Sequence, residues 1–129
     1  MSVIKDLKID RGKAVKQDRP IFSGDVYQQF LVKAEHSDEH TVTAVFFENG
    51  ARTRPHTHVD DQTLHVVEGT CVVADENDRR LLGVGEMAFV KKGEWHWHGA
   101  AKGTNACHLS IKKDGPTSLD VPERDWADW

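Results

Sequence analysis

Turn signals recur at short intervals along this chain of 129 residues and divide it into short apolar runs. Gly, Asn, Asp, Ser, Lys and Pro supply these turns at positions 23–25, 48–50, 75–78, 83–85, 92–93, 102–103 and 114–116. The runs between them are rich in Val, Phe, Leu and Thr, and we expect strands at 26–34, 41–48, 63–67, 70–74, 87–90 and 107–111. Short strands at such spacing predict an all-β sandwich or barrel. The length predicts one domain, residues 1–129.

Three histidines and a glutamine form the second strong pattern. His56 and His58 are separated by one residue, so in a strand their side chains point to the same face and can reach one ion. His96 can approach from another strand, and Gln62 stands at the start of the 63–67 run. Imidazole nitrogens suit transition metals. The pattern therefore predicts a metal site whose ligands are His56, His58, Gln62 and His96.

The same residues resemble the two motifs of the cupin superfamily. The first motif reads Gly, five residues, His-X-His, three or four residues, Glu, six residues, Gly. This chain keeps every spacing, with Gln in place of Glu: Gly50, His56, His58, Gln62 and Gly69. The second motif reads Gly, five residues, Pro-X-Gly, two residues, His, three residues, Asn. Here its positions hold Gly85, Lys91 in place of Pro, Gly93, His96 and Ala100 in place of Asn.

This resemblance implies a double-stranded β-helix, the jelly-roll barrel of the cupins, with its core motifs over residues 50–100. A closer resemblance is to the small single-domain cupins that include manganese-dependent hydroxynitrile lyases similar to mandelonitrile lyase. The segments that carry it are 50–53, 56–58, 62–64, 96–101 and 108–109. In that subfamily three His and one Gln bind the metal, and two further His line the pocket. Those two match His98 and His108 here.

The resemblance also implies a cofactor, an activity and an oligomer. The cofactor is one divalent transition metal, manganese first, with iron, nickel, zinc or cobalt as alternatives. The activity is a lyase reaction that cleaves a C–C bond in a small hydroxy or carbonyl compound. A non-haem metal dioxygenase is one alternative, and a non-catalytic cupin that binds a metal or small ligand is the other. Small cupins of this kind are expected to form a homodimer.

Three residues decide how such a site would work. Gln62 supplies a neutral oxygen where the motif has a carboxylate, so a bound dication keeps its full charge and acts as a stronger Lewis acid. His98 follows His96 on the same strand face and could serve as a general base, or it could belong to an exposed aromatic turn. His108 alternates with Ala106 and Ser110, which predicts a polar face inside the barrel, although an outward position is the alternative.

The remaining histidines and tryptophans are expected to have other roles. His36 and His40 lie in a hydrophilic connection and should be exposed. His65 alternates out of phase with Gln62, so it should point away from the metal. Two tryptophans flank His96, and we expect Trp95 and Trp97 to pack in a core. Near the end of the chain, Trp126 and Trp129 could dock on the barrel, contact another subunit or cover the pocket.

Composition excludes several function classes. The net charge is −4 with both signs interspersed, so no basic stripe indicates nucleic-acid binding, and the expected partner is a small-molecule substrate. The first residues mix charges with short apolar pieces, which predicts neither a signal peptide nor a membrane anchor. Cys71 and Cys107 make no disulfide framework, which favours a reduced, cytoplasmic protein. Residues 1–20 could form an edge strand or an arm that reaches a partner subunit.

Overall fold

The computed structural model of the chain describes residues 3–4 and 7–129. Those ranges contain thirteen strands, two 3-10 helices and no α-helix, which confirms the all-β prediction. No helix in the described ranges is long and apolar enough to span a membrane. In chain order the elements are η1 (Arg11–Lys13), β1 (Val15–Lys16), β2 (Phe22–Ser23), β3 (Val26–Val32), β4 (Thr41–Phe47), β5 (Arg52–Thr53), β6 (Thr57–His58), β7 (Gln62–Glu68), β8 (Cys71–Asp75), β9 (Arg79–Leu82), β10 (Met87–Val90), β11 (His96–Ala100), β12 (Ala106–Lys112), β13 (Thr117–Ser118) and η2 (Trp126–Asp128).

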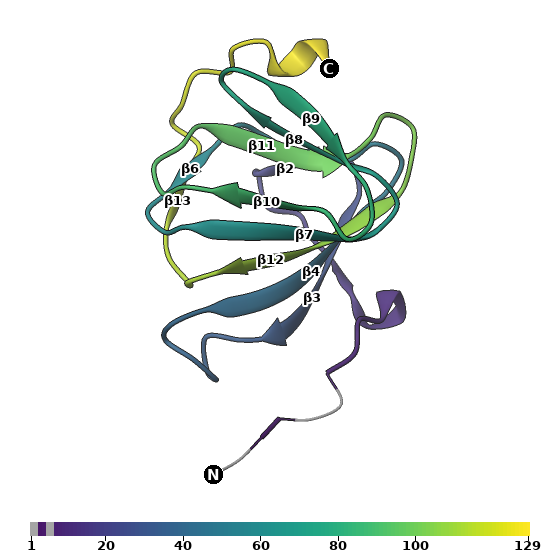
Figure 1. Cartoon of the computed structure of the whole chain (residues 1–129), viewed down its shortest axis with the longest axis vertical. Coiled ribbons are helices and arrows are strands. Elements are labelled where there is room, and N and C mark those ends of the chain that lie inside the picture. Colours follow the sequence, from purple (N-terminus) through teal and green to yellow (C-terminus); the bar gives the residue numbers. More distant parts are fainter. Residues whose placement is uncertain (1–2, 5–6) are drawn as a thin grey trace.

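The strands form three antiparallel sheets. The largest has the order β1-β3-β4-β12-β7-β10, and the second has the order β2-β5-β11-β8-β9. A third sheet pairs β6 with β13. Neighbouring strands such as β4 and β12 come from distant parts of the chain, as in a jelly roll. Figure 1 shows the sheets wrapped into one barrel, with η1 and the C-terminal η2 on opposite sides of it.

The interior of the barrel has an apolar end and a polar end. Inward-facing side chains alternate along β7, where Gln62, Leu64 and Val66 are buried and the residues between them are partly exposed. Apolar residues fill one end of the interior: Val26, Val45, Phe47, Ala51, Val66, Cys71, Ala100 and Ala106. Each fully buried large apolar side chain stabilises the fold by about 1.5–3 kcal/mol. The other end holds the histidines.

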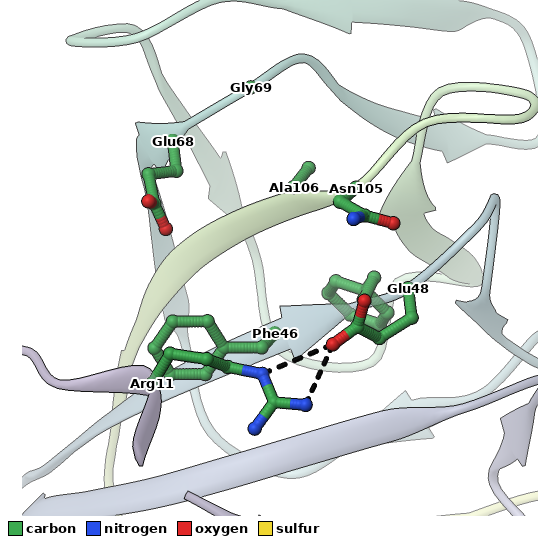
Figure 2. Close-up of a pocket in the computed structure, with 8 residues that line it drawn as sticks. Arg11, Phe46, Glu48, Glu68, Gly69, Asn105 and Ala106 are labelled. Carbon is green, nitrogen blue, oxygen red and sulfur yellow. Dashed lines mark hydrogen bonds and ion pairs between the residues drawn. The ribbon is translucent and has the colours of Figure 1, made fainter. Parts of the chain in front are cut away.

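The N-terminal segment covers the outer face of the six-stranded sheet. It packs over Phe46, Cys107 and Ala44, and β1 then pairs with β3 at the edge of the sheet. The Arg11 guanidinium lies 3.7 Å from the centre of the Tyr27 ring and donates two hydrogen bonds to Glu48, of 3.1 and 2.7 Å. Figure 2 shows this ion pair beside a surface cavity of about 310 Å³. Of the two alternatives for residues 1–20, an edge strand or an arm that reaches a partner subunit, the structure shows an edge strand at β1, and residues 1–2 and 5–6 lie outside the described residues.

The C-terminal tail packs on the outer face of the five-stranded sheet. Trp126 is 6% exposed, and its Nε1 donates to the carbonyl of Thr53 at 3.0 Å. The guanidinium of Arg52 lies 4.3 Å from the Trp126 ring and 5.1 Å from the Trp97 ring. Trp95 and Trp97 belong to the same cluster, which confirms their packing role, and Trp129 packs against its edge. Trp126 thus docks on the barrel.

Two motif glycines have structural causes. Gly50 has φ 74° and Gly69 has φ 68°, values in the left-handed region that favours glycine. A Cβ at Gly69 would also collide with the carbonyl oxygen of Asn105. These glycines allow the turns that end β4 and β7, and so they frame the segment that carries His56, His58 and Gln62.

Both thiols are buried inside strands and are not paired with each other. Cys71 lies in β8 and Cys107 in β12, and burial raises the pKa of each to about 12. A thiol with so high a pKa is almost entirely protonated at neutral pH and reacts slowly.

Candidate metal centre

The backbone joins the two histidine segments directly. The N–H of His56 donates to the carbonyl of His96 at 3.0 Å, and the N–H of His96 donates back at 3.1 Å. His58 ends β6, Gln62 begins β7 and His96 begins β11, so these three residues come from three different sheets, and His56 lies just before β6. Local alternation and this single bridge therefore place four side chains predicted as ligands at one point.

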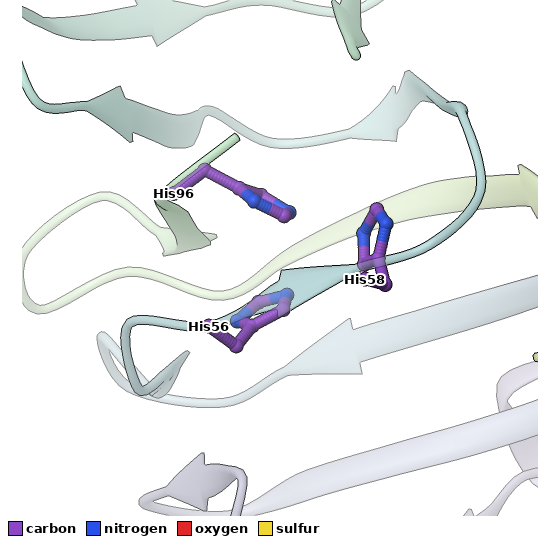
Figure 3. A group of neighbouring side chains, drawn as sticks. All are labelled: His56, His58 and His96. Atoms are coloured by element: carbon purple, nitrogen blue, oxygen red, sulfur yellow. The ribbon is translucent and has the colours of Figure 1, made fainter. Parts of the chain in front are cut away.

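The rings of His56, His58 and His96 turn toward one another, as Figure 3 shows. One ring nitrogen from each histidine lies within 4.8 Å of the others. Each Nδ1 is held by a backbone carbonyl: His56 by Arg54 at 2.7 Å, His58 by Asp60 at 2.7 Å and His96 by Glu94 at 2.9 Å. A carbonyl only accepts, so each neutral ring carries its hydrogen on Nδ1 and its lone pair on Nε2.

The side-chain amide of Gln62 completes this group. Its Oε1 lies 3.0 Å from Nε2 of His58 and 3.3 Å from Nε2 of His96. Its Nε2 donates to Oγ of Ser110 at 2.8 Å, which directs the oxygen toward the histidines. Lone pairs on two imidazoles and one amide oxygen repel each other at this range, and a cation among them would satisfy all three. The donor set therefore fits a divalent transition metal.

Burial keeps the imidazoles of His56 and His96 neutral. The pKa of His56 is lowered to about 4 and that of His96 to about 3, mainly by burial and to a lesser extent by the neighbouring histidines. The bonds to the carbonyls of Arg54 and Glu94 act in the opposite sense without offsetting burial. A metal binds the unprotonated ring, so at neutral pH both residues are in the form that coordinates.

His98 and His108 form a buried pair beside the group. Nδ1 of His98 lies 2.9 Å from Nε2 of His108, and Phe47 packs against both rings. His98 lines a cavity of about 180 Å³ that also borders His56, His58 and Gln62; we call it the site cavity. His108 is 0% exposed, and of the two residues only His98 lines the site cavity. Burial lowers the pKa of both residues, to about 4 for His108.

The structure thus brings all six predicted site residues together at one end of the barrel. His36 and His40 are exposed and His65 points away from the group, as the sequence predicts. Two basic residues on the wall of the site cavity, Arg19 and Lys112, were missed. Continued alternation from His108 through Ser110 could have indicated Lys112, whereas Arg19 lies in a segment with no strand pattern.

Comparisons with known proteins agree with this geometry. The family model described as Cupin domain matches residues 43–112. An (R)-mandelonitrile lyase from Granulicella tundricola is 36% identical over 109 residues, which cover 83% of this chain and 79% of that protein. A cupin-like protein from Thermotoga maritima has a TM-score of 0.77 at 29% identity, covering 88% of this chain and 87% of that one. The polyketide cyclase RemF from Streptomyces resistomycificus has a TM-score of 0.76 at 18% identity, covering 98% and 94%. This last likeness concerns the fold alone.

Proposed function

This chain belongs to the cupin family, and on that premise we propose that it is a metal-dependent lyase that cleaves a C–C bond in a small hydroxy compound, like a hydroxynitrile lyase. One observation supports the proposal most. The imidazole nitrogens of His58 and His96 and the amide oxygen of Gln62 lie close together, beside a cavity that His98 also lines. The relative named as a mandelonitrile lyase supports the reaction type.

We assign His56, His58, Gln62 and His96 as the residues that hold one divalent ion, with manganese as the first candidate. All four donors are neutral, so the ion keeps its full double charge. A divalent ion held there supplies Lewis-acid polarisation of a substrate oxygen. Ser110 fixes the orientation of the Gln62 amide through its hydroxyl oxygen.

His98 is assigned as the general base. To accept a proton on Nε2 it must keep its hydrogen on Nδ1 and donate it to Nε2 of His108 at 2.9 Å. His108 then fixes the tautomer of His98 and acts as a positioning residue. Because burial lowers the pKa of His98, its ring is neutral at pH 7 and can accept a proton.

The proposed step balances for a cyanohydrin. The hydroxyl proton moves to His98, the oxygen forms a carbonyl, and the C–C bond breaks with its electron pair on cyanide. His98 then returns the proton to cyanide, so that an aldehyde and hydrogen cyanide leave. Phe47 packs edge-on against the ring of His98, which is 5% exposed, so little of that ring is open to water.

The test combines metal analysis with a cleavage assay. Protein purified without added metal is analysed for its elements and then assayed with mandelonitrile beside an oxygen electrode. His98→Ala should keep the metal and lose roughly 10²–10⁴-fold in rate, as the loss of a general base does. His56→Ala should lose the metal, and His40→Ala, at an exposed histidine, is the control. An unchanged rate in His98→Ala, or bound iron with substrate-dependent oxygen uptake, would contradict the lyase proposal.

A further inference from the structure

A lysine stands beside the proposed ligand group on the inner face of β12. Alternation along this strand places Lys112 on the face that already carries His108 and Ser110. In the sheet, Lys112 is the direct neighbour of Gln62 on β7. Its side chain is half-buried and lines both the site cavity and an adjoining cavity of about 460 Å³. The positively charged side chain of Lys112 therefore lines the site cavity on the strand next to Gln62, a proposed metal ligand.

An arginine from another part of the chain borders the same two cavities. The guanidinium of Arg19 donates to Oε1 of Gln28, a buried residue of β3, and lies 5.3 Å from the centre of the Phe22 ring. Gln28 also lines both cavities. These contacts hold the guanidinium at the wall and leave other N–H donors of Arg19 available for a ligand.

Among the described residues, neither of these two cations forms an ion pair, which is also true of other basic residues such as Arg52, Arg54 and Lys102. Within the described part of the chain, neither Arg19 nor Lys112 has a carboxylate oxygen within 4.0 Å. Nζ of Lys112 donates to the carbonyl of Lys113 at 3.0 Å. Ion pairs within that distance are formed instead by Arg11, Lys16, Lys33, Arg79, Arg80 and Arg124.

Without a metal, the two carboxylates of Asp60 and Asp114 balance the two cations Lys112 and Arg19. Burial lowers its pKa first, Asp60 and Asp114 raise it, and Arg19 lowers it again. Among the described residues, Asp114 is the one carboxylate that borders the site cavity, which Arg19 and Lys112 also line. A dication held by four neutral ligands would add further positive charge. Lys112 is half-buried and Arg19 is exposed, so with the ion bound the net charge of this group would be positive and would favour an anionic ligand.

We propose that the substrate of this site carries a carboxylate, which Lys112 and Arg19 bind while its hydroxyl faces the histidines. The substrate class is then a small hydroxy acid or a hydroxy compound with an acidic side group, unlike the neutral mandelonitrile. The assignment rests on the proposed function for the role of the hydroxyl, and on the two cations for the carboxylate. Lys112 and Arg19 are specificity residues in this scheme, since they contact the substrate away from the bond that breaks.

The test uses a matched pair of probes, 3-hydroxybutyrate and its neutral amide, titrated calorimetrically into metal-loaded and metal-free protein. Wild type should bind the acid at least about tenfold more tightly than the amide, because a charge-assisted hydrogen bond contributes about 1.5–3 kcal/mol. Lys112→Met should abolish this preference and Lys112→Arg should keep it. Lys113→Met removes the same charge at the neighbouring exposed lysine and should leave the preference intact.

Three outcomes would overturn the assignment. Wild type could bind acid and amide equally, the Lys112→Met and Lys113→Met variants could lose the preference equally, or the preference could exist only with metal and survive Lys112→Met. The last result would mean that the ion alone binds the carboxylate. The lyase proposal is tested separately by cleavage assays with mandelonitrile and with a cyanohydrin that carries a carboxylate. Cleavage of neither compound contradicts the reaction type, whereas the acid–amide comparison tests the carboxylate assignment alone.

Discussion

Single residues decide the chemistry of this barrel, and Gln62 decides most. Its amide has two ends with different partners: Nε2 donates to Ser110, and Oε1 faces His58 and His96. The ligand set was predictable because its spacing is local and the backbone bridge between His56 and His96 follows from the barrel. The cavity wall was not predictable to the same extent, since Arg19 reaches it through a contact with Gln28 that no local pattern indicates.

Replacing Gln62 with Glu tests the role of this neutral ligand. The added negative charge should tighten metal binding by at least roughly tenfold, which requires only about 1.4 kcal/mol. It should also slow cyanohydrin cleavage, because a less positive centre stabilises a developing alkoxide less. A chelator titration and a cleavage assay on both proteins measure the two effects. If resistance to chelator and rate are both unchanged, Gln62 does not touch the metal and the site consists of three histidines.

At the scale of elements, the sequence predicts the long strands well and the short ones poorly. The runs at 41–48, 63–67, 87–90 and 107–111 became β4, β7, β10 and β12 with ends shifted by at most one residue. β3 ends at Val32, two residues earlier than expected, because a turn begins at Lys33. The strands β1, β2, β5, β6 and β13 have two residues each, too few for a pattern.

Two longer strands were also missed, for different reasons. The edge strand β9 (Arg79–Leu82) begins with two arginines, which suit a sheet edge but break the apolar signal. The strand β11 (His96–Ala100) mixes histidine, tryptophan and glycine, and it is buried on both faces. His96 and His98 face the site, while Trp97 packs outward under Trp126. One strand thus joins the candidate metal centre to the cluster that anchors the C-terminal tail.

At the scale of the whole molecule, buried histidines link stability to pH. The folded-state pKa is lowered by burial for His56, His96 and His108, to between about 3 and about 4. Between pH 6.5 and these values the unfolded chain therefore binds more protons than the folded one. The stability of the metal-free protein should be complete above pH 6.5 and fall as the pH drops toward 4.

The contribution of His108 can be isolated. A lowering of its pKa from 6.5 to about 4 corresponds to about 3 kcal/mol of unfolding free energy lost across that window. His108→Gln should reduce the difference in stability between pH 7 and pH 4 by up to that amount, measured by urea unfolding of metal-free protein. His40→Gln, at an exposed position, is the control and should leave the difference unchanged. If His108→Gln and wild type lose the same stability between pH 7 and pH 4, the lowered pKa of His108 does not contribute to the pH dependence of stability.

The homodimer expected from the family resemblance stays a prediction. Four large apolar side chains are exposed near the open edges β9 and β10: Leu81, Val84, Met87 and Phe89. Exposed edges and apolar patches are usually covered in native proteins. We expect sedimentation equilibrium to give the mass of two chains, and Phe89→Glu to give that of one. Leu119→Glu, at an exposed apolar residue elsewhere, is the control. A monomeric wild type would refute the prediction.

The candidate ligands come from all three sheets, and Gln62 and His96 are 34 positions apart. An ion bound by both residues would close the loop between them, as a disulfide bond does. In unfolded chains that kept the ion bound, this cross-link would reduce the conformational entropy. Cys71 and Cys107 are unpaired in this fold and form no disulfide cross-link. The metal would then be the one cross-link of the barrel, so that its supply would govern the lifetime of the protein as well as its chemistry.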